Sequence, residues 1–252
     1  MKSAIITGAS CGLGEEYLKQ VIQQMPEIEE IWLIARRQEK LEMLASRFPD
    51  RCIRCLPLDL TDAESFDIYQ KELETAQPDI VLLINNAGCG KLGLLADAAF
   101  AEQAGMVDLN CRALTAITVL SLPYMQRGAG ILNVSSIASY APTPRMTVYC
   151  ATKSYVSAFS KSLHEELRPR GITVLTACPG PMATGFLEAA NIIGRSRTFE
   201  TLPYCHPERV ARKSLSRLRR GKTWYTDRGF YKLYRVLGKL LPHSLVMKFS
   251  KT

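Results

Sequence analysis

A phenol and an ammonium group lie four residues apart near the middle of the chain, at Tyr149 and Lys153. If the segment from Thr147 onward is helical, residues i and i+4 share a face, and the two side chains project into the same space. A phenol with an unperturbed pKa of about 10 is a poor acid–base catalyst at neutral pH, but a nearby cation favours its charged form and lowers that pKa. The spacing therefore predicts a tyrosine that exchanges a proton with a substrate.

A hydroxyl group stands upstream of this pair, at Ser136. The apolar run Ile131–Ser135 reads as a buried strand, and Ser136 follows at its carboxyl end, where a hydroxyl can hold a carbonyl oxygen. Tyr-x-x-x-Lys also occurs by chance in many helices, and strand-terminal serines commonly bond to turn backbone. Neither feature specifies a site by itself.

A glycine-rich loop follows the first apolar run of the chain. Ala4–Thr7 predicts a short strand, Glu15–Gln24 predicts a helix, and Gly8, Gly12 and Gly14 lie between them. This Gly-x-x-x-Gly-x-Gly spacing, in a strand-to-helix context, is typical of a turn that approaches a pyrophosphate at a helix amino terminus. We expect the three glycines to permit, in order, a tight turn, close backbone approach and close packing of the helix.

Together these features resemble the short-chain dehydrogenase/reductase family, and the resemblance runs over nearly the whole chain. Its segments, in the family's order and spacing, are Thr7 to Gly14, Asp59-Leu60, Asn85-Asn86-Ala87-Gly88, the tetrad Asn110, Ser136, Tyr149 and Lys153, and Pro179-Gly180 with Thr184 four positions after the glycine. So many matches in register make coincidence a poor explanation.

The resemblance implies hydride exchange with a nicotinamide cofactor at the tetrad. Tyr149 would exchange a proton with the substrate oxygen, and Ser136 would hydrogen-bond that oxygen. Lys153 would lower the pKa of Tyr149 and bind ribose hydroxyls, and Asn110 would hold, through its main chain, a water that links Lys153 to solvent. Such prearranged donors stabilise a developing alkoxide, while the cofactor carries the hydride.

The resemblance also implies a set of cofactor-binding residues. These are Gly8, Ser10, Cys11, Gly12, Leu13 and Gly14 in the loop, Arg36 and Arg37 after the second strand, Asp59 and Leu60 at the adenine, Asn86, Ala87 and Gly88 after a central strand, and Tyr149, Lys153, Pro179, Gly180 and Thr184 toward the nicotinamide.

Cofactor choice is predicted from the end of the second expected strand, Ile31–Ile34. Arg36 and Arg37 follow it, with no acid there. An acid at this point would accept the ribose 2′-hydroxyl of the unphosphorylated cofactor, whereas arginine suits a 2′-phosphate. We therefore expect NADP(H) ahead of NAD(H), with Arg36 as the main contact, although Arg36 also reads as a solvated start of the next helix. Many relatives that prefer NADP place a basic residue where this chain has Cys11.

Seven strand-like runs alternate with helical stretches along the 252 residues. The candidates are Ala4–Thr7, Ile31–Ile34, Arg51–Pro57, Ile80–Ile84, Ile131–Ser135, Ile172–Ala177 and Thr223–Tyr225. Such alternation predicts parallel strands joined by crossover helices, and α/β chains of this length commonly form one domain. We expect an α/β, doubly wound, seven-stranded parallel sheet of Rossmann type, with helices on both faces, as a single domain over residues 1–252.

The sequence carries no expected signal for secretion, membrane insertion or metal binding. The first strand begins almost at the amino terminus, which leaves no room for a signal peptide and favours a cytoplasmic location. No apolar stretch reaches the length of about 20 residues that a membrane-spanning helix needs. Among the eight cysteines, Cys52 and Cys55 lack a second closely spaced Cys or His pair, and in a regular strand their side chains point to opposite faces. No metal site is expected.

Basic charge is concentrated in the carboxyl-terminal segment 208–252. It contains 13 of the 32 Lys and Arg residues but 2 of the 24 Asp and Glu residues. From Tyr231 to Leu241, apolar and basic residues interleave at helix-like spacing. We favour a helix packed over the substrate cleft, because family members vary this segment to shape the pocket. Peripheral contact with an anionic membrane is second, and a nucleic-acid patch, which no recognised motif accompanies, is third.

The sequence therefore predicts an NADP(H)-dependent oxidoreductase that interconverts a carbonyl and an alcohol. The loop from Pro181 to His206 is partly apolar and favours a hydrophobic substrate, although any lid buries some apolar side chains on closing. Two alternatives remain, a catalytically quiet nucleotide-binding sensor or scaffold, and an epimerase or dehydratase with a tightly held cofactor. By resemblance, the helices that carry Asn110 and Tyr149 form the interface of a homodimer or homotetramer.

Overall fold

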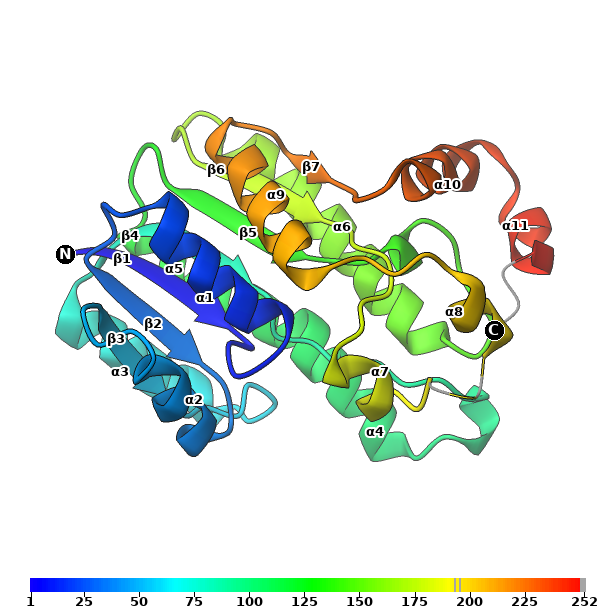
Figure 1. Cartoon of the computed structure of the whole chain (residues 1–252), viewed down its shortest axis with the longest axis horizontal. Coiled ribbons are helices and arrows are strands. Elements are labelled where there is room, and N and C mark those ends of the chain that lie inside the picture. The colour runs from blue at the N-terminus through cyan, green and yellow to red at the C-terminus, as the bar shows by residue number, and fades with distance from the viewer. Residues whose placement is uncertain (193, 195, 250–252) are drawn as a thin grey trace.

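Seven parallel strands form the single sheet that organises the molecule (Figure 1). In the computed structural model, which describes residues 1–192, 194 and 196–249, the strands are β1 (Lys2–Thr7), β2 (Glu30–Ile34), β3 (Cys52–Leu56), β4 (Asp79–Asn85), β5 (Gly130–Val134), β6 (Thr173–Ala177) and β7 (Trp224–Tyr225). Their order across the sheet is β3-β2-β1-β4-β5-β6-β7. The predicted sheet is confirmed, and its order reverses between β1 and β4, where such sheets bind ligands beyond their carboxyl ends.

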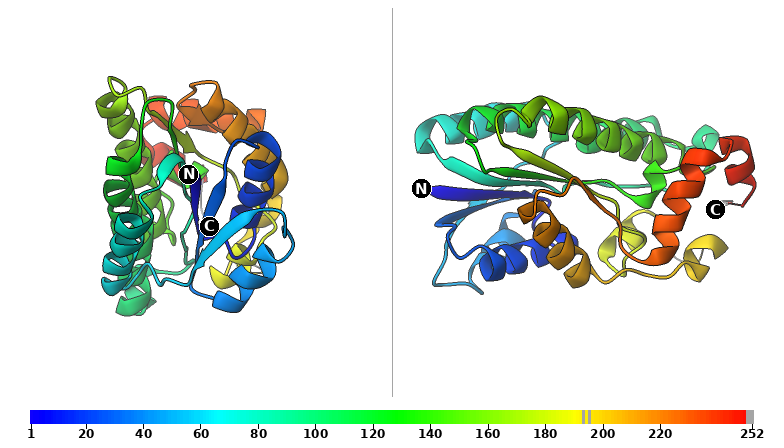
Figure 2. Two further views of the ribbon diagram at one scale, coloured as in Figure 1. Left: turned by 90° about the vertical axis from the view of Figure 1, so that its left-hand side faces the viewer. Right: turned by 90° about the horizontal axis from the view of Figure 1, so that it is seen from above.

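Helices cover both faces of the sheet. They are α1 (Leu13–Gln24), α2 (Gln38–Ala45), α3 (Glu64–Ala76), α4 (Phe100–Val107), α5 (Leu114–Ser121), α6 (Thr147–Leu167), α7 (Gly185–Ala189), α8 (Arg197–Thr201), α9 (Pro207–Arg219), α10 (Gly229–Leu240) and α11 (His243–Phe249). Three 3₁₀ turns, η1 (Leu95–Asp97), η3 (Leu122–Tyr124) and η4 (Ile137–Ser139), and one π-helical turn, η2 (Asp108–Ala113), complete the described elements. Figure 2 shows α1, α2 and α9 on one face and α3, α5 and α6 on the other.

The central strands are apolar on both sides because both faces of the sheet are covered. In β1, Ile5 packs with α3 and α5, whereas its neighbours Ala4 and Ile6 pack with α1. This is why the strands appear in the sequence as continuous apolar runs rather than as alternating patterns.

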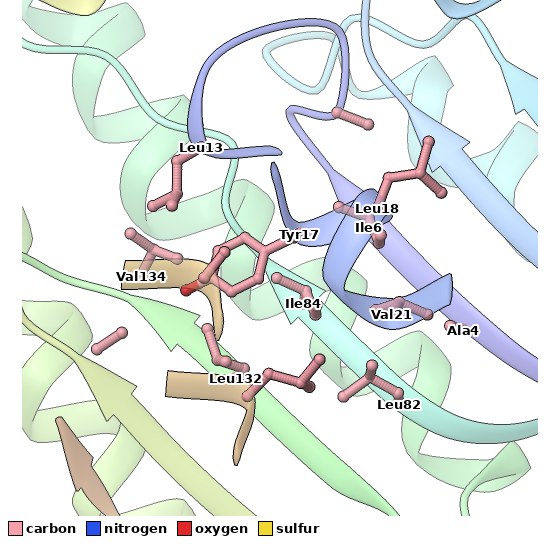
Figure 3. Close-up of a cluster of buried hydrophobic side chains, with 14 of the residues drawn as sticks. Ala4, Ile6, Leu13, Tyr17, Leu18, Val21, Leu82, Ile84, Leu132 and Val134 are labelled. Carbon is pink, nitrogen blue, oxygen red and sulfur yellow. The ribbon is translucent and has the colours of Figure 1, made fainter. Parts of the chain in front are cut away.

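Tyr17 joins the core on the α1 face to helix α9. Its ring packs among Leu132 and Val134 of β5 and Ile84 of β4 (Figure 3). Its hydroxyl reaches the Ser214 hydroxyl of α9 at 2.9 Å, so the one polar atom of this buried side chain is satisfied. Packing and this hydrogen bond together hold α1 and α9 side by side on the sheet.

One helical run is long and apolar enough to span a membrane by length and composition. It covers Phe100–Tyr124 within the described residues, so the expectation that no stretch would reach this length is wrong by that measure. The run contains an Asp108–Arg112 ion pair at 2.9 Å, and its Thr118 hydroxyl accepts a hydrogen bond from Asn85 of β4. These contacts are those of a sheet-covering helix, so length and composition are weak evidence here for a membrane span.

Helices α10 and α11 lie beyond the carboxyl ends of the strands, outside the three layers (Figures 1 and 2). Tyr231 is fully buried and packs directly over Gly180, and its hydroxyl donates to Pro203 O at 2.7 Å. Gly238 lies so close to Tyr140 that a Cβ there would be 2.6 Å from the Tyr140 carbonyl oxygen. The carboxyl-terminal helix predicted from the sequence is therefore seated against the rest of the fold at two points.

Candidate active site

The glycine loop between β1 and α1 has the backbone that its sequence predicts. Gly8 and Gly12 adopt φ values of 66° and 58°, in the left-handed region that favours glycine. A Cβ on Gly8 would lie 2.8 Å from Ala87 Cα, and a Cβ on Gly14 would collide with the Gly8 carbonyl oxygen. The loop is therefore a tight turn pressed against the segment that follows β4.

The amino terminus of α1 offers unpartnered backbone donors to an anion. Gly12 is its first residue outside the helix, and no side chain caps it. The free N–H groups and the positive end of the helix dipole favour a phosphate group there. Two acids in the first turn do not oppose this, because Lys19 contacts both Glu15 and Glu16, at 3.1 and 2.7 Å. These residues fit the pyrophosphate of a dinucleotide.

The two arginines after β2 lie in different surroundings. Arg36 is 73% exposed and its guanidinium is 3.8 Å from the Asp59 carboxylate. Arg37 instead reaches the glycine loop, where Nη2 donates to Ser10 Oγ at 3.4 Å and approaches Cys11 Sγ at 3.8 Å. The predicted main contact, Arg36, thus lies beside the predicted adenine contact, and Arg37 lies closer to the loop.

Two further members of the predicted cofactor set are side chains of the core rather than exposed contacts. Leu13, the first residue of α1, packs in the core on the α1 face, and Leu60 packs with α3 on the other. Their burial anchors the loop and the segment after β3 at the carboxyl side of the sheet.

Asn86 and Ala87 tie the end of β4 to the glycine loop. The Thr7 hydroxyl accepts hydrogen bonds from both backbone N–H groups, at 3.1 and 3.0 Å. The Asn86 side chain donates to the carbonyl oxygens of Thr7 and Gly8, each at 3.1 Å. The predicted signature therefore serves here to fix the turn.

Two of the catalytic candidates, Asn110 and Lys153, meet at Gly88. A Cβ on Gly88 would lie 3.0 Å from Asn110 Oδ1 and 3.2 Å from Lys153 Nζ. A larger residue would push both side chains away. The sequence identified Gly88 by resemblance, and the structure gives a steric reason for glycine.

Ser136, Tyr149 and Lys153 converge at the carboxyl edge of β5. Ser136 precedes the turn η4, which it caps by accepting from Ala138 N at 3.1 Å, and it also hydrogen-bonds the Tyr149 hydroxyl. Lys153 lies one turn along α6, with Nζ 5.8 Å from the Tyr149 ring centroid, and donates to Val134 O at 3.0 Å. The predicted helix and the shared face of Tyr149 and Lys153 are both present.

Burial dominates the electrostatics of this site. Burial raises the pKa of Tyr149, and the hydrogen bond from Ser136 only partly offsets it. Burial likewise lowers the pKa of Lys153 to about 8, because the ammonium is withdrawn from water. The net shift of the Tyr149 pKa is therefore upward, opposite to the expected lowering, because desolvation of the phenol dominates it. The separate influence of Lys153 on that pKa stays a prediction.

Asn110 holds the site together from a π-helical turn. Its side-chain amide donates to Cys89 O at 2.9 Å and to Thr152 Oγ1 at 3.0 Å, and its carbonyl accepts from Cys89 N at 2.9 Å. A π turn widens the helix and moves main-chain carbonyls out of α-helical register, and such turns are frequent at functional sites. The sequence singled out Asn110 but gave no signal of this turn.

The segment after β6 closes the site from the side of the glycine loop. Pro179 O accepts from Ile137 N at 3.0 Å, which links it to the turn after Ser136. A Cβ on Gly12 would lie 3.3 Å from the Thr184 side chain, so Thr184 faces the loop. Gly180 lies directly under the Tyr231 ring of α10. The predicted residues from opposite ends of the chain therefore border one region.

Sequence reasoning missed two residues that press on Tyr149, the candidate acid. Phe186 lies 5.8 Å from Tyr149 between ring centroids. A Cβ on Gly90 would lie 2.7 Å from the Phe186 ring and 3.1 Å from that of Tyr149. Their contact with Tyr149 depends on the path of the loop after β6, which periodicity does not report.

A family model described as short chain dehydrogenase matches residues 2–192. The chain belongs to the short-chain dehydrogenase family. It is accordingly an oxidoreductase of a family that uses nicotinamide cofactors and acts on small molecules.

Individual short-chain dehydrogenases and related proteins agree with this assignment. Nodulation protein G of Rhizobium sp. (strain N33) is 34% identical over 191 residues, which cover 75% of this chain and 74% of that protein. A solved short-chain dehydrogenase from Sphingobium yanoikuyae, in complex with NADPH, is 26% identical, with a TM-score of 0.79 over 90% of this chain and 87% of that one. A family member from Burkholderia phymatum, in complex with NAD, shares the fold at 18% identity and a TM-score of 0.82, over 100% of this chain and 95% of that one.

Burial of Lys153 predicts a pH-dependent stability. In the unfolded chain its pKa returns to 10.5, so the folded state bears the full cost of the buried ammonium below pH 8, and that cost disappears as the pH rises to 10.5. Lys153→Met removes the charge and should raise the free energy of unfolding at pH 7 by about 1 to 3 kcal/mol. The gain should shrink by pH 10.

Urea titrations of the parent protein and the variant at pH 7 and pH 10 measure both values. Lys71→Met, at an exposed position of α3, is the matched control and should change stability little at either pH. A Lys153→Met variant less stable than the parent at pH 7 would show that the ammonium stabilises the fold.

Proposed function

We propose that this protein is an NADP(H)-dependent oxidoreductase that interconverts a hydrophobic carbonyl compound and its alcohol, with Tyr149 as the acid and base. The observation that carries the proposal is the convergence of Ser136, Tyr149 and Lys153 beside the glycine loop. A protein that only sensed or stored a nucleotide would have no use for a buried phenol, hydroxyl and ammonium in one group.

The chain's own residues supply proton transfer and orientation. Ser136 holds the substrate oxygen, and Tyr149 donates a proton to it during reduction or accepts one during oxidation. The raised pKa of Tyr149 keeps the phenol protonated at neutral pH, which suits the reducing direction. Lys153 stabilises the phenolate that donation leaves and binds ribose hydroxyls, while the main chain at Asn110 holds a relay water. The bound nicotinamide supplies or accepts the hydride.

The basic residues after β2 support a preference for NADP(H). Arg36 and Arg37 bring two guanidinium groups to the region between Asp59 and the glycine loop, and no acid occupies the position that would accept a 2′-hydroxyl. The S. yanoikuyae relative, which contains NADPH, agrees with this choice. Both arginines would contribute, because a planar guanidinium binds a phosphate by charge-assisted, bidentate hydrogen bonds.

The surroundings of Tyr149 support a hydrophobic substrate. Its ring belongs to a cluster of apolar side chains from four segments: Leu92, Met106, Met146, Leu187, Ala190 and Ile192, with Phe186 and Tyr204 packed against them. The surroundings of the Tyr149 ring are therefore apolar. A substrate with an apolar body next to its carbonyl would keep these side chains out of water. A charged substrate would place an unpaired charge among apolar groups, which costs free energy.

We also propose a homodimer or homotetramer built on the α4–α6 side of the molecule. Val107, Val119 and Tyr155 are 45%, 57% and 40% exposed there, on the helices next to Asn110 and Tyr149. Burying them against a second copy would remove apolar surface from water. Light scattering of the purified chain should give two or four times its 28.1 kDa mass. A monomeric mass at working concentration would count against this assembly.

Replacing the phenol tests the acid. Tyr149→Phe should lower kcat for carbonyl reduction by at least a hundredfold, while NADPH affinity stays within an order of magnitude, because the hydroxyl serves proton transfer more than binding. Reduction of a ketone panel, followed by cofactor absorbance, gives kcat, and fluorescence titration gives affinity.

The matched control for that variant is Tyr124→Phe, a partly buried tyrosine in η3 away from the site. It should keep parental turnover. Near-normal turnover by Tyr149→Phe would remove Tyr149 as the acid. Failure of the parent to exchange free NADPH and NADP⁺ with any substrate would instead favour an epimerase or dehydratase.

Charge reversal after β2 tests the cofactor preference. Arg36→Asp and Arg37→Asp should each raise KM for NADPH about tenfold or more and change KM for NADH less than threefold, since each removes a contact that only the 2′-phosphate can use. Lys71→Asp, a charge reversal of equal size on α3, controls for the change in net charge. Equal losses with both nicotinamides would mean that the arginines do not read the 2′-phosphate.

A further inference from the structure

A basic hollow of about 410 Å³ lies between α9, β7 and the first turn of α10. Six cationic residues line it, namely Arg209, Lys213, Arg217, Arg220, Arg228 and Lys232. Ser136, Tyr149 and Lys153 are not among its lining residues, so this hollow is separate from the candidate active site. It also lies beyond residue 192, where the family match ends.

The charge of the basic hollow is largely uncompensated. Its one acidic residue, Asp227, is 3% exposed and pairs with Arg209 at 3.0 Å. Across the described residues no carboxylate forms an ion pair with the other five cations. Arg217 and Arg228 use some of their donors on the backbone carbonyls of Trp224 and Tyr204. The hollow therefore keeps a strong local excess of positive charge.

Next to the hollow, α10 turns its apolar side toward solvent. We define the apolar stripe as Phe230, Leu233, Val236, Leu237 and Leu240, which are 55%, 58%, 50%, 40% and 75% exposed. The buried side of the helix carries Tyr231 and Gly238. An ordinary surface helix has the opposite polarity, with its apolar residues against the core. Within the part of the chain that the structure describes, the apolar stripe is thus a largely uncovered surface.

Basic residues run along one border of the apolar stripe. At 100° per residue, Lys232 and Lys239 project from the same flank of α10, next to Val236. Arg235 lies further round, with its guanidinium 4.1 Å from the centroid of the Trp224 ring. Lys232 also lines the basic hollow. The apolar stripe and the basic hollow are therefore parts of one continuous surface.

We propose that the basic hollow and the apolar stripe together bind the surface of an anionic lipid bilayer. Helices with an apolar face flanked by lysine and arginine lie in the membrane interface, with the apolar face at the boundary between headgroups and acyl chains. The hollow's cations then meet the lipid phosphates and carboxylates. A bilayer therefore contacts both the apolar stripe and the cations of the basic hollow.

Other occupants use only half of this surface. A second copy that paired its own stripe with this one would cover the leucines but would offer the hollow's cations no opposite charge, since it carries the same basic residues. A nucleic acid would engage the cations but leave the leucines in water. The bilayer satisfies both, which is why we choose it.

The position of α10 relates this surface to the active site. Tyr231 packs over Gly180, and Gly238 packs on Tyr140, which directly follows the turn capped by Ser136. A bilayer bound to the apolar stripe would therefore lie on the carboxyl side of the sheet, the side that carries the catalytic candidates. The binding proposal does not depend on the reaction, because it concerns only surface residues outside the site.

Vesicle sedimentation of the full chain tests the proposal without cofactor or substrate. The protein should pellet with vesicles of mixed phosphatidylcholine and phosphatidylserine at least tenfold more tightly than with phosphatidylcholine alone. Raising the salt concentration should weaken the binding, because exposed charges are screened. Equal partition to both vesicles, or none to either, would overturn the proposal.

Two double variants separate the charged and apolar parts. Lys213→Glu/Lys232→Glu should reduce binding to the anionic vesicles at least tenfold. Leu233→Ser/Leu240→Ser should reduce it by a similar factor while leaving net charge unchanged. The matched controls, Lys40→Glu/Lys71→Glu and Met43→Ser/Ile68→Ser, change exposed residues of α2 and α3 and should bind as the parent does.

Further measurements exclude the other occupants. Ketone reduction by all four variants should match the parent, which keeps a failure of this proposal distinct from a failure of the proposed reaction. Binding that survives both test variants would contradict the proposal. So would a smaller assembly for Leu233→Ser/Leu240→Ser by light scattering, or binding of duplex DNA as tight as that of anionic vesicles.

Discussion

Burial of a single ammonium group constrains the centre of this molecule. Lys153 is 5% exposed, and its described hydrogen bond is to the neutral carbonyl of Val134. An ammonium so placed destabilises the folded state, which the lowered pKa expresses. It can persist only if its neighbours leave room for it and hold its helix in one position. Gly88 provides the room, and the contacts of α6 with the sheet provide the position.

Those contacts are a seam of small polar side chains between helices and strands. Ser135 donates to the backbone carbonyl of Lys153 itself at 2.8 Å and hydrogen-bonds Ser157 at 2.9 Å. Further along, Asn133 donates to Ser160 at 2.9 Å and accepts from Asn85 at 2.8 Å. Satisfied polar groups in a low-dielectric interior are directional, so they fix the rotation of α6 as apolar packing alone would not. The direction of Tyr149 follows from that rotation.

Sequence patterns predicted the parts of this structure that depend on local order. All seven strands were located because a sheet covered on both faces demands continuous apolar runs. The face shared by Tyr149 and Lys153 was predicted because helical spacing is fixed. The direction in which the Tyr149 pKa shifts was not predicted. That shift depends on how far the folded chain buries the phenol, which the tertiary structure determines. For the same reason, the contacts of Arg37 with Ser10 and Cys11 could not be read from the order of the residues.

The carboxyl-terminal helix shows a further limit of periodicity. A period of 3.6 residues establishes that α10 has an apolar side, but it does not say whether that side faces the core. Two residues decide the orientation: Gly238 allows the backbone to approach Tyr140, and Tyr231 fills the space above Gly180. A helix seated by one glycine and one aromatic ring needs no leucines on its inner face. The apolar side is then left outward. The predicted amphipathic helix is therefore present, and its inner side packs on Tyr140 and Gly180, while the expected role as a cover of the substrate cleft stays a prediction.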